Sequence, residues 1–394
     1  MNIVGIIAEY NPLHRGHVWQ IAETRRALGA DCGVVCAMSG NWVQRGECAL
    51  TDKWTRAAMA LRGGVDLVLE LPTVWATSSA ESFARGGVGV LCATGLVDTI
   101  SFGSESGDLE ELRVVSQCLE TPGFRETLRT QLNRGLSFAA ARQNAVADLL
   151  GPAAECLTGP NNNLAVEYLR ALPPGMEALA VRRVGAGHDG GPAGGYASAS
   201  VIREWLREGK MQRAEDYLPE PWQGDIASME WCERAILARL RSLSLEELER
   251  LPDSGEGLAA RLLEAARKGR TLEEVFALAK TKRYAHARIR RLALWAFLGL
   301  TAADRPARVP YLRVLGFTDR GRTLLREMEG RAAVPILTKA AHGRRLDREA
   351  ARLLELEARC TDLYGLCFAE PWEGGREWTS GPVRLLNAQG MSYQ

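Results

Sequence analysis

The chain has 394 residues, of which 46% are hydrophobic and 25% charged, so it can bury a large core divided over two or three domains. Its 49 Lys and Arg residues nearly balance its 48 Asp and Glu residues, which gives a net charge of +1. This balance excludes the attraction of nucleic acid by an overall positive field, and any such binding therefore needs a local basic patch.

In residues 2–104, short apolar runs alternate with segments of helical periodicity. A continuous run of the kind found in buried parallel strands occupies residues 2–8, and further strands are expected at 33–38, 66–71 and 99–102. Helical spacing of apolar residues is found at 16–28, 52–62 and 79–91. Because this alternation is typical of a parallel sheet with helices on both faces, we predict an α/β domain over residues 1–210.

Helical patterns dominate most of the remaining chain. Residues 107–150 are expected to form a helical insertion, residues 179–184 the last strand, and residues 185–195, which include six glycines, a loop. From residue 211 to 394, a composition rich in Leu, Ala, Arg and Glu predicts a second, mainly α-helical domain. Within that domain, residues 305–317 could form either a strand or an irregular link.

The cysteines and the apolar stretches bear on the location of the protein. Nine cysteines without a Cys-x-x-Cys pair argue against a disulfide framework and against a zinc site, and a reducing cytoplasm is expected. The N-terminal apolar run stops at Glu9 and lacks the basic start of a signal peptide. The longest apolar stretch, near residues 292–303, is too short to span a bilayer, so no membrane association is expected.

Residues 9–17, Glu-Tyr-Asn-Pro-Leu-His-Arg-Gly-His, follow the first predicted strand and open the first predicted helix. In such a turn, free backbone N–H groups and the helix dipole attract a phosphate group. His14 and His17 share one face of the first helical turn, and Gly16 lets a nucleotide approach the backbone. Two imidazoles there can donate hydrogen bonds to phosphate oxygens that gain charge in a transition state. The alternative is a helix start that carries two surface histidines.

A second segment of this kind covers residues 196–203, Tyr-Ala-Ser-Ala-Ser-Val-Ile-Arg. Ser198 or Ser200 can cap a helix and present a hydroxyl group to a phosphate. Arg203, on the first turn of that helix, could bind the outer phosphates of a triphosphate. The alternative is an ordinary serine cap followed by a surface arginine, and by itself this segment is a weak indication.

Together the two segments resemble the HxGH nucleotidyltransferase superfamily. Longer strings narrow the resemblance to the tRNA(Met) cytidine acetate ligase family, and they cover most of residues 2–300. These strings are MSGNWVQRGE at 38–47, DKW at 52–54, GVDLVLELP at 64–72, FGSE at 102–105, PNN at 160–162 and KRY at 282–284. The resemblance implies a Rossmann-like HxGH nucleotidyltransferase domain with a parallel sheet, followed by a mainly α-helical C-terminal domain.

The resemblance also implies a reaction in two steps. Acetate attacks the α-phosphate of ATP, which gives acetyl-adenylate and pyrophosphate. The N4 amine of the wobble cytidine of elongator tRNA(Met) then attacks the acetyl carbonyl, which gives N4-acetylcytidine and AMP. The catalytic residues implied are His14 and His17. Mg²⁺ is expected to accompany the triphosphate, and no metal site made by the protein itself is predicted.

The ATP site that the resemblance implies combines the turn at residues 7–18 with positions on later elements. The residues carried over are Ile7, Ala8, Glu9, Tyr10, Asn11, Pro12, Leu13, His14, Gly16, His17, Val18, Gly103, one of Asn161 or Asn162, and Arg183. Ser198, Ser200 and Arg203 complete the expected site. An amide such as Asn162 can bind the edge of adenine or a ribose hydroxyl group, although a turn with local capping is the alternative for this run of asparagines.

Contact with tRNA is expected along the densest basic segment, residues 280–291. The candidate residues are Lys282, Arg283, Arg288, Arg290 and Arg291, with Gln44, Arg45 and Lys53 as further candidates near the ATP site. Tyr284 could stack on an unpaired base, and a solvated charged helix face is the alternative. Two other functions remain open at this point: a small-molecule adenylyltransferase of the same superfamily, and a nucleotide-sensing or RNA-binding module without catalysis.

Overall fold

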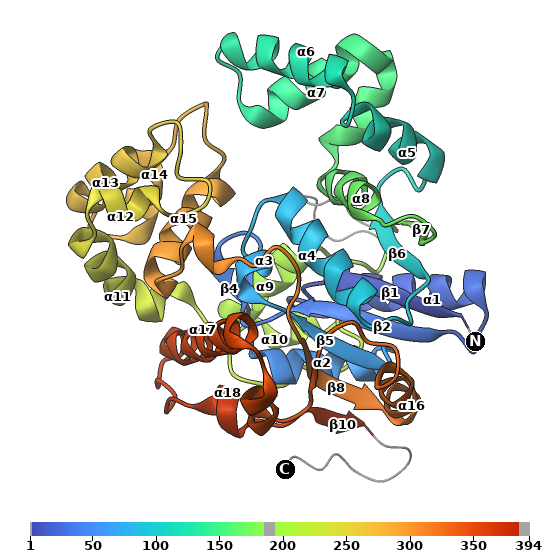
Figure 1. Ribbon diagram of the computed structural model, residues 1–394. Coiled ribbons are helices and arrows are strands. Elements are labelled where there is room, and N and C mark those ends of the chain that lie inside the picture. Colours follow the sequence, from blue (N-terminus) through green and yellow to red (C-terminus); the bar gives the residue numbers. More distant parts are fainter. Residues whose placement is uncertain (1, 185–193, 386–394) are drawn as a thin grey trace.

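The structure, a computed structural model, describes residues 2–184 and 194–385, so most of the loop expected at 185–195 and the last nine residues of the expected second domain lie outside it. Its centre is a mostly parallel sheet with the strand order β10-β8-β5-β2-β1-β6-β7 (Figure 1). The strands are β1 (Ile3–Ala8), β2 (Gly33–Ser39), β5 (Leu67–Leu71), β6 (Thr99–Ser104), β7 (Glu177–Arg182), β8 (Leu312–Thr318) and β10 (Val383–Leu385), and β9 (Ile336–Leu337) pairs with β8.

Helices cover both faces of this sheet. They are α1 (Arg15–Leu28), α2 (Lys53–Arg62), α3 (Thr73–Ala76) and α4 (Ala80–Ala93). Val4 and Ile6 of β1 pack into a core shared with α1 and α2, whereas Ile3 and Ile7 pack into a core shared with α4. Successive side chains of a strand point to opposite faces, so a continuous apolar run is buried on both of them. The predicted α/β class with a mostly parallel sheet is confirmed.

Two groups of helices stand apart from the sheet in Figure 1. The first lobe consists of α5 (Leu109–Cys118), α6 (Pro122–Asn133) and α7 (Phe138–Leu150), and the chain returns to β7 through the 3-10 segment η1 (Gly151–Thr158) and α8 (Pro160–Ala171). Asp108, Thr121 and Ser137 cap the three helices, because their side chains accept hydrogen bonds from N–H groups of the first turns. Residues 107–150 are therefore helical, as the sequence pattern indicated.

The second lobe contains five helices and follows two short ones. Helices α9 (Ala199–Arg207) and α10 (Met211–Glu215) come first. The lobe itself consists of α11 (Met229–Ser242), α12 (Leu245–Glu249), α13 (Leu258–Lys268), α14 (Leu272–Ala279) and α15 (His286–Leu298). A two-stranded hairpin of β3 (Trp42–Val43) and β4 (Glu47–Cys48) connects the sheet to this lobe, since Arg290 of α15 forms an ion pair with Glu47. No helix of the described residues has both the length and the apolar character needed to cross a bilayer.

After the second lobe, the chain returns to the sheet. Strand β8 pairs antiparallel with β5, and β10 pairs parallel with β8, so residues 211–394 contribute strands as well as helices. Of the two alternatives for residues 305–317, a strand is found over the second half. The remaining segments are η2 (Ala302–Asp304), α16 (Asp319–Met328), η3 (Ala340–Arg345), α17 (Arg348–Tyr364), η4 (Gly365–Cys367) and α18 (Arg376–Thr379).

Candidate active site

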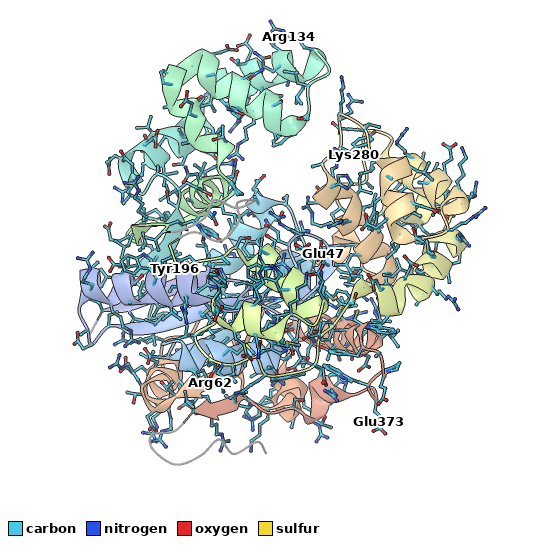
Figure 2. The ribbon with its side chains drawn as sticks, turned by 180° about the vertical axis from the view of Figure 1, so that it is seen from behind. Glu47, Arg62, Arg134, Tyr196, Lys280 and Glu373 are labelled. Atoms are coloured by element: carbon cyan, nitrogen blue, oxygen red, sulfur yellow. The ribbon has the colours of Figure 1, made fainter. Side chains whose placement is uncertain are left out.

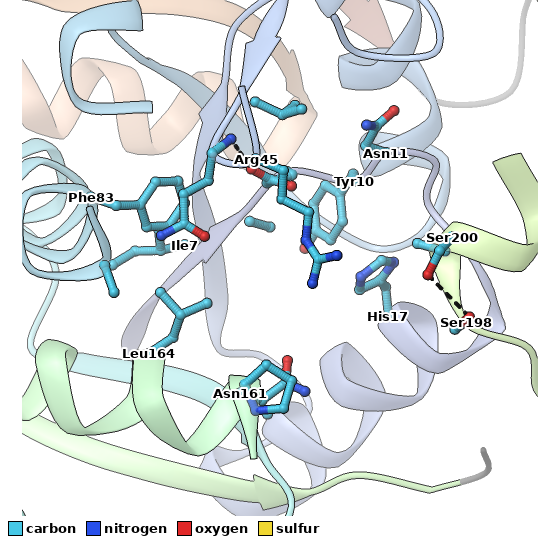
Figure 3. Close-up of a pocket in the computed structure, with 18 of the residues that line it drawn as sticks. Ile7, Tyr10, Asn11, His17, Arg45, Phe83, Asn161, Leu164, Ser198 and Ser200 are labelled. Atoms are coloured by element: carbon cyan, nitrogen blue, oxygen red, sulfur yellow. Dashed lines mark hydrogen bonds between the residues drawn. The ribbon is translucent and has the colours of Figure 1, made fainter. Parts of the chain in front are cut away.

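A cavity of about 600 Å³ lies at the carboxyl end of β1, where the chain turns into α1 (Figure 3). Open parallel α/β sheets bind their ligands at this edge. Residues of β1, β6, the β3–β4 hairpin and the starts of α1, α8, α9 and α15 line the cavity. The residues expected in the ATP site that line it are Ile7, Ala8, Glu9, Tyr10, Asn11, His14, His17, Gly103, Asn161, Arg183, Ser198, Ser200 and Arg203.

The two histidines are fixed by the backbone of the first turn of α1. His14 is the N-cap residue, and its Nδ1 accepts a hydrogen bond from Gly16 N–H at 3.0 Å. Nδ1 of His17 accepts a hydrogen bond from His14 N–H at 3.2 Å, and the two rings stack with centroids 3.7 Å apart. Since each Nδ1 is an acceptor, each neutral ring carries its proton on Nε2. Neither Nε2–H group has a hydrogen-bond partner in the part of the chain that the structure describes, so both can donate to a ligand.

Both rings are neutral at neutral pH. Burial lowers the pKa of His14 to about 3, and the charges of Arg183 and Arg203 act in the same direction. Burial, together with His14 and Arg183, lowers the pKa of His17 well below its ordinary value. Neutral imidazoles of this kind act as hydrogen-bond donors and not as acids.

Two guanidinium groups face the cavity beside the histidines. Nη1 of Arg203 donates to the backbone oxygen of Asn11 at 2.8 Å, and Nη1 of Arg183 donates to Oδ1 of Asn161 at 3.4 Å. Neither arginine forms an ion pair with a carboxylate of the described residues. Burial lowers the pKa of both, so their charges are poorly solvated and would be stabilised by an anionic ligand.

The start of α9 presents two hydroxyl groups to the same space. Ser198 caps the helix, since its Oγ accepts a hydrogen bond from Val201 N–H at 3.4 Å. Oγ of Ser198 lies 3.3 Å from Oγ of Ser200, as the dashed line in Figure 3 marks. The N-terminus of α9 and the N-terminus of α1 thus meet at one cavity, where both helix dipoles favour a negative charge.

The two asparagines at the start of α8 have different roles. Asn161 lines the cavity, and its backbone and side-chain N–H groups donate to the carboxylate of Glu105 at 3.0 and 2.6 Å. Asn162 is only 3% exposed, and its Oδ1 accepts hydrogen bonds from the Ser104 hydroxyl group and from Glu105 N–H. Asn162 therefore joins α8 to the end of β6, and of the two alternatives it is Asn161 that faces the ligand space.

Four other expected residues do not line the cavity. Leu13 belongs to the core shared with α1 and α2, and Val18 packs against that core. Gly16 lies at a small neighbouring cavity together with His14. Pro12 is also absent from the cavity wall. The turn that holds these residues shapes the site, but their side chains do not face it.

Several residues of the cavity wall were not singled out as ATP-site residues from the sequence. One side is apolar and aromatic, with Phe83, Phe102, Leu164 and Tyr168, which suits the flat face of a nucleobase. The others are Gln20, Val43, Gln44, Arg45, Glu47, Ala80, Pro160, Asn163, Ala199, Ala285 and Ala287. Gln44 and Arg45 are among the expected RNA contacts near the ATP site, and the structure places both in the cavity wall. For Glu47, the available indication was its place in the string at 38–47 that carried the family resemblance. Nothing in the sequence distinguishes the apolar residues of the cavity wall from ordinary core residues.

Lys53 was wrongly predicted to contact RNA. Its side chain is 1% exposed, and its ammonium group forms ion pairs with Glu70 at 2.7 Å and Glu377 at 2.5 Å. Tyr284 is also buried, and its hydroxyl group donates to the backbone oxygen of Glu256, so it is not available for stacking on a base.

The other basic candidates divide into two groups. Arg288, Arg290 and Arg291 form ion pairs with Glu256, Glu47 and Asp253 respectively. Lys282 and Arg283 are exposed, and neither forms an ion pair with another described residue. Unlike the three arginines, those two side chains can therefore bind phosphate without breaking an internal ion pair.

The described residues contain no cluster of three or more His, Cys, Asp or Glu side chains that could hold a metal ion. Of the acidic groups in the cavity wall, Glu47 is paired with Arg290 and Glu9 accepts a hydrogen bond from Gln44 N–H. This donor set does not form a metal cage made by the protein.

Comparison with known proteins identifies the family. A model of the family described as HIGH Nucleotidyl Transferase matches residues 1–376. The tRNA(Met) cytidine acetate ligase of Fervidobacterium nodosum is 38% identical over 375 residues, which cover 89% of this chain and 87% of that protein. The enzyme of the same name from Caldanaerobacter subterraneus subsp. tengcongensis is 37% identical over 392 residues, which cover 93% of this chain and 96% of that protein.

Solved structures agree with the sequence comparison. The crystal structure of Thermotoga maritima TmcAL bound with alpha-thio ATP superimposes with a TM-score of 0.89 at 31% sequence identity, and 98% of this chain and 100% of that chain are covered. The apo form of the same protein gives a TM-score of 0.91 with the same identity and coverage. The chain therefore belongs to the tRNA(Met) cytidine acetate ligase family of HIGH nucleotidyl transferases, as its sequence motifs predicted.

Proposed function

We propose that this chain is an ATP-dependent tRNA-modifying ligase that activates acetate as acetyl-adenylate and transfers the acetyl group to N4 of the wobble cytidine of elongator tRNA(Met). The observation that carries the proposal is the pair of neutral, stacked imidazoles of His14 and His17, which share the cavity with the guanidinium groups of Arg183 and Arg203. The names of the relatives support the acceptor, and the alpha-thio ATP bound by the Thermotoga maritima protein supports the nucleotide.

In the first step of this proposal, the residues at the starts of α1 and α9 hold the triphosphate. Arg203 and the hydroxyl groups of Ser198 and Ser200 bind the outer phosphates, where the helix N-termini favour negative charge. Nε2–H of His14 and of His17 donate to the oxygens of the α-phosphate while an acetate oxygen attacks the phosphorus atom. These donors stabilise the added charge in the transition state, and pyrophosphate leaves.

In the second step, the N4 amine of cytidine attacks the acetyl carbonyl, and AMP leaves. This step needs an unstacked base, which a single-stranded anticodon loop can supply. Mg²⁺ enters this proposal as part of the substrate, bound to the triphosphate oxygens, because the described part of the cavity wall offers no protein cage for it. A cytoplasmic location is part of the same proposal, since ATP and tRNA are found there.

The deciding experiment incubates the protein with labelled acetate, ATP and either tRNA(Met) or phosphate-bearing coenzyme precursors. We expect label in cytidine of the tRNA, together with AMP and pyrophosphate. A tRNA(Met) transcript whose wobble cytidine is replaced by uridine is the matched control and should stay unlabelled. Adenylyl transfer to a phosphate acceptor, without label in any tRNA, would instead establish the small-molecule adenylyltransferase.

A further inference from the structure

Among the described residues, two carboxylates belong to the wall of the cavity, and they differ in their partners. Glu47 is neutralised by Arg290 of α15. Glu9, the first residue after β1, is half-buried, and one of its oxygens, Oε1, accepts a hydrogen bond from Gln44 N–H at 2.7 Å. No ion pair joins Glu9 to another described residue. Glu9 therefore has an oxygen that can accept a hydrogen bond or a proton from a molecule in the cavity.

Glu9 shares the cavity wall with the catalytic candidates and with the β3–β4 hairpin. His14, His17 and the start of α9 line the same cavity, and the charge of Arg203 acts on the Glu9 carboxylate. In the hairpin, Gln44 N–H binds Glu9, and the ion pair of Glu47 attaches the hairpin to α15. A base and an acyl group that occupy this cavity together therefore share it with the Glu9 carboxylate.

The second step of the proposed reaction needs a group that accepts a proton. When the N4 amine of cytidine attacks the acetyl carbonyl, a C–N bond forms, the bond between the carbonyl carbon and the AMP oxygen breaks, and AMP leaves with that electron pair. The amine must then lose one proton. His14 and His17 cannot take it without breaking the turn, because the lone pair of each Nδ1 already accepts a backbone N–H.

We propose that the carboxylate of Glu9 accepts the proton that the N4 amine of the acceptor cytidine loses during acetyl transfer. This inference rests on the proposed function and assigns the base of its second step. After the acetylated tRNA leaves, the proton passes from Glu9 to water.

The surroundings of Glu9 suit this role. Burial raises the pKa of its carboxyl group, which makes the carboxylate a stronger base. The hydrogen bond from Gln44 and the charges of Arg203 on α9, Arg56 on α2 and Arg45 in the hairpin act in the opposite direction and limit this rise in the pKa. The titratable side chains of Tyr10, His14, His17 and Tyr168 share the cavity wall with Glu9 among the described residues, and burial and the charge of Glu9 both raise the pKa of the Tyr168 hydroxyl group.

The test separates the two half-reactions in the Glu9→Gln variant. The amide oxygen of glutamine still accepts the hydrogen bond from Gln44 N–H, so the turn is preserved. Acetate-dependent exchange of pyrophosphate into ATP measures the first step, and single-turnover acetylation of tRNA(Met) measures the second. Because Glu9 also lines the expected ATP site, the two rates are compared with each other, and we expect acetyl transfer to fall about 10²- to 10⁴-fold further than exchange falls, the range for loss of a general base.

Two further variants and the pH dependence of the transfer rate complete the experiment. Glu23→Gln, on the outer side of α1 where Glu23 pairs only with Arg26 among the described residues, should change neither step. Glu9→Asp keeps a carboxylate and should recover part of the transfer rate. The transfer rate of the unmodified protein should become independent of pH once Glu9 is ionised, whereas the rate of Glu9→Gln should keep rising with hydroxide concentration.

Two results would overturn the assignment. Transfer by Glu9→Gln at the unmodified rate would show that another group, such as the AMP phosphate, accepts the proton. Equal loss of exchange and transfer would show that Glu9 serves the adenylation step or the turn. If the unmodified protein shows no acetate-dependent exchange at all, the proposed function itself fails, and that outcome is distinct from either of these.

Discussion

At the scale of single residues, the chemistry of His14 and His17 depends on two backbone N–H groups. Gly16 N–H fixes the tautomer of His14, and His14 N–H fixes that of His17. Both hydrogen bonds join residues within a stretch of four, so the spacing of the motif is sufficient to predict them. This is why the sequence alone pointed to these rings.

Removal of either ring should lower the rate of adenylate formation. We expect His14→Ala and His17→Ala each to reduce acetate-dependent pyrophosphate exchange by about 10²- to 10³-fold, and the double variant to lose less than the product, because the donors act on one transition state. His342→Ala, in η3, is the control and should exchange normally. Normal exchange by the two cavity variants, with an unchanged thermal melting curve, would remove the histidines from the mechanism.

The low pKa of His14 makes a separate prediction about stability. The folded-state pKa of about 3 lies below the ordinary 6.5, so below pH 6.5 the unfolded chain binds a proton that the folded chain excludes. The free energy of unfolding must therefore fall as the pH drops from 6.5 toward 3. At pH 5 the loss from this group is about 2 kcal/mol.

The measurement compares the unmodified protein with His14→Gln by urea unfolding at pH 7.5 and pH 5. Between pH 7.5 and pH 5, the free energy of unfolding of the variant should fall by about 2 kcal/mol less than that of the unmodified protein. An equal loss in both proteins would mean that His14 titrates near its ordinary pKa, and it would then be charged in part at the pH of the reaction.

Other residues of the site could not be assigned from local spacing. Asn161 and Asn162 are neighbours in sequence, and either one fitted the expected role. The choice between them depends on Glu105, whose carboxylate binds the start of α8 and whose backbone N–H holds Asn162 toward β6. Those hydrogen bonds join residues more than fifty positions apart, and periodicity carries no information about them.

At the scale of secondary-structure elements, the same dependence on contacts between distant residues explains why the C-terminal strands are hard to predict from sequence. The parallel strands β1, β2 and β5 are continuous or nearly continuous apolar runs, whereas β6 and β7 mix apolar with polar residues, and most of the length of all five was predicted. Strand β8 contains Arg313, which reads as a surface residue, yet its side chain is 2% exposed and forms an ion pair with Glu377 of α18 at 3.3 Å. A charged side chain can be buried in a strand when a partner distant in sequence neutralises it. The sequence of such a strand then lacks a continuous apolar run, and apolar patterns do not detect it.

Lys53 belongs to the same buried group. It starts α2, and its ammonium group joins Glu70 of β5 to Glu377 of α18, which are 17 and 324 positions away. This group of charges attaches the C-terminal helices to the sheet. Replacement of one member leaves its partners charged and without compensation in a buried site.

Lys53→Met should therefore destabilise the fold by about 3–5 kcal/mol, because Glu70 would lose its ion pair in a buried site and Glu377 would keep only Arg313. Urea unfolding measures the change, and Lys268→Met, at an exposed pair on α13, is the control with an expected change below about 1 kcal/mol. The affinity of the folded fraction for tRNA should not change. A stable Lys53→Met variant with weakened tRNA binding would restore Lys53 as a residue that binds RNA.

At the scale of the whole molecule, two helical lobes flank the part of the chain that carries the cavity. Figure 2 shows Lys280 on the second lobe, on the side that faces the lobe with Arg134. The sequence predicted helices in both lobes. Their relative positions depend on interactions such as the ion pair of Arg290 with Glu47, which joins residues 243 positions apart, and were not predictable from periodicity.

This arrangement places the exposed Lys282 and Arg283 just before α15, whose first turn lines the cavity. A tRNA whose wobble base enters the cavity must bring its backbone close to that turn. Exposed cations there gain binding energy by releasing counterions from the phosphates. The paired arginines of α15 would have to break internal ion pairs to do the same.

We therefore expect the double variant Lys282→Ala, Arg283→Ala to bind tRNA(Met) about tenfold more weakly. The slope of log K against log salt concentration should become shallower by about 0.7 for each phosphate that the variant no longer neutralises. Acetate-dependent pyrophosphate exchange should stay unchanged, since that step needs no tRNA.

The double variant Arg267→Ala, Lys268→Ala, at the exposed end of α13, removes the same charge from the same lobe and is the matched control. Filter binding at several salt concentrations measures both variants. Equal losses of affinity in the two would show a general charge effect, and no loss in the first would place the tRNA on another face of the protein.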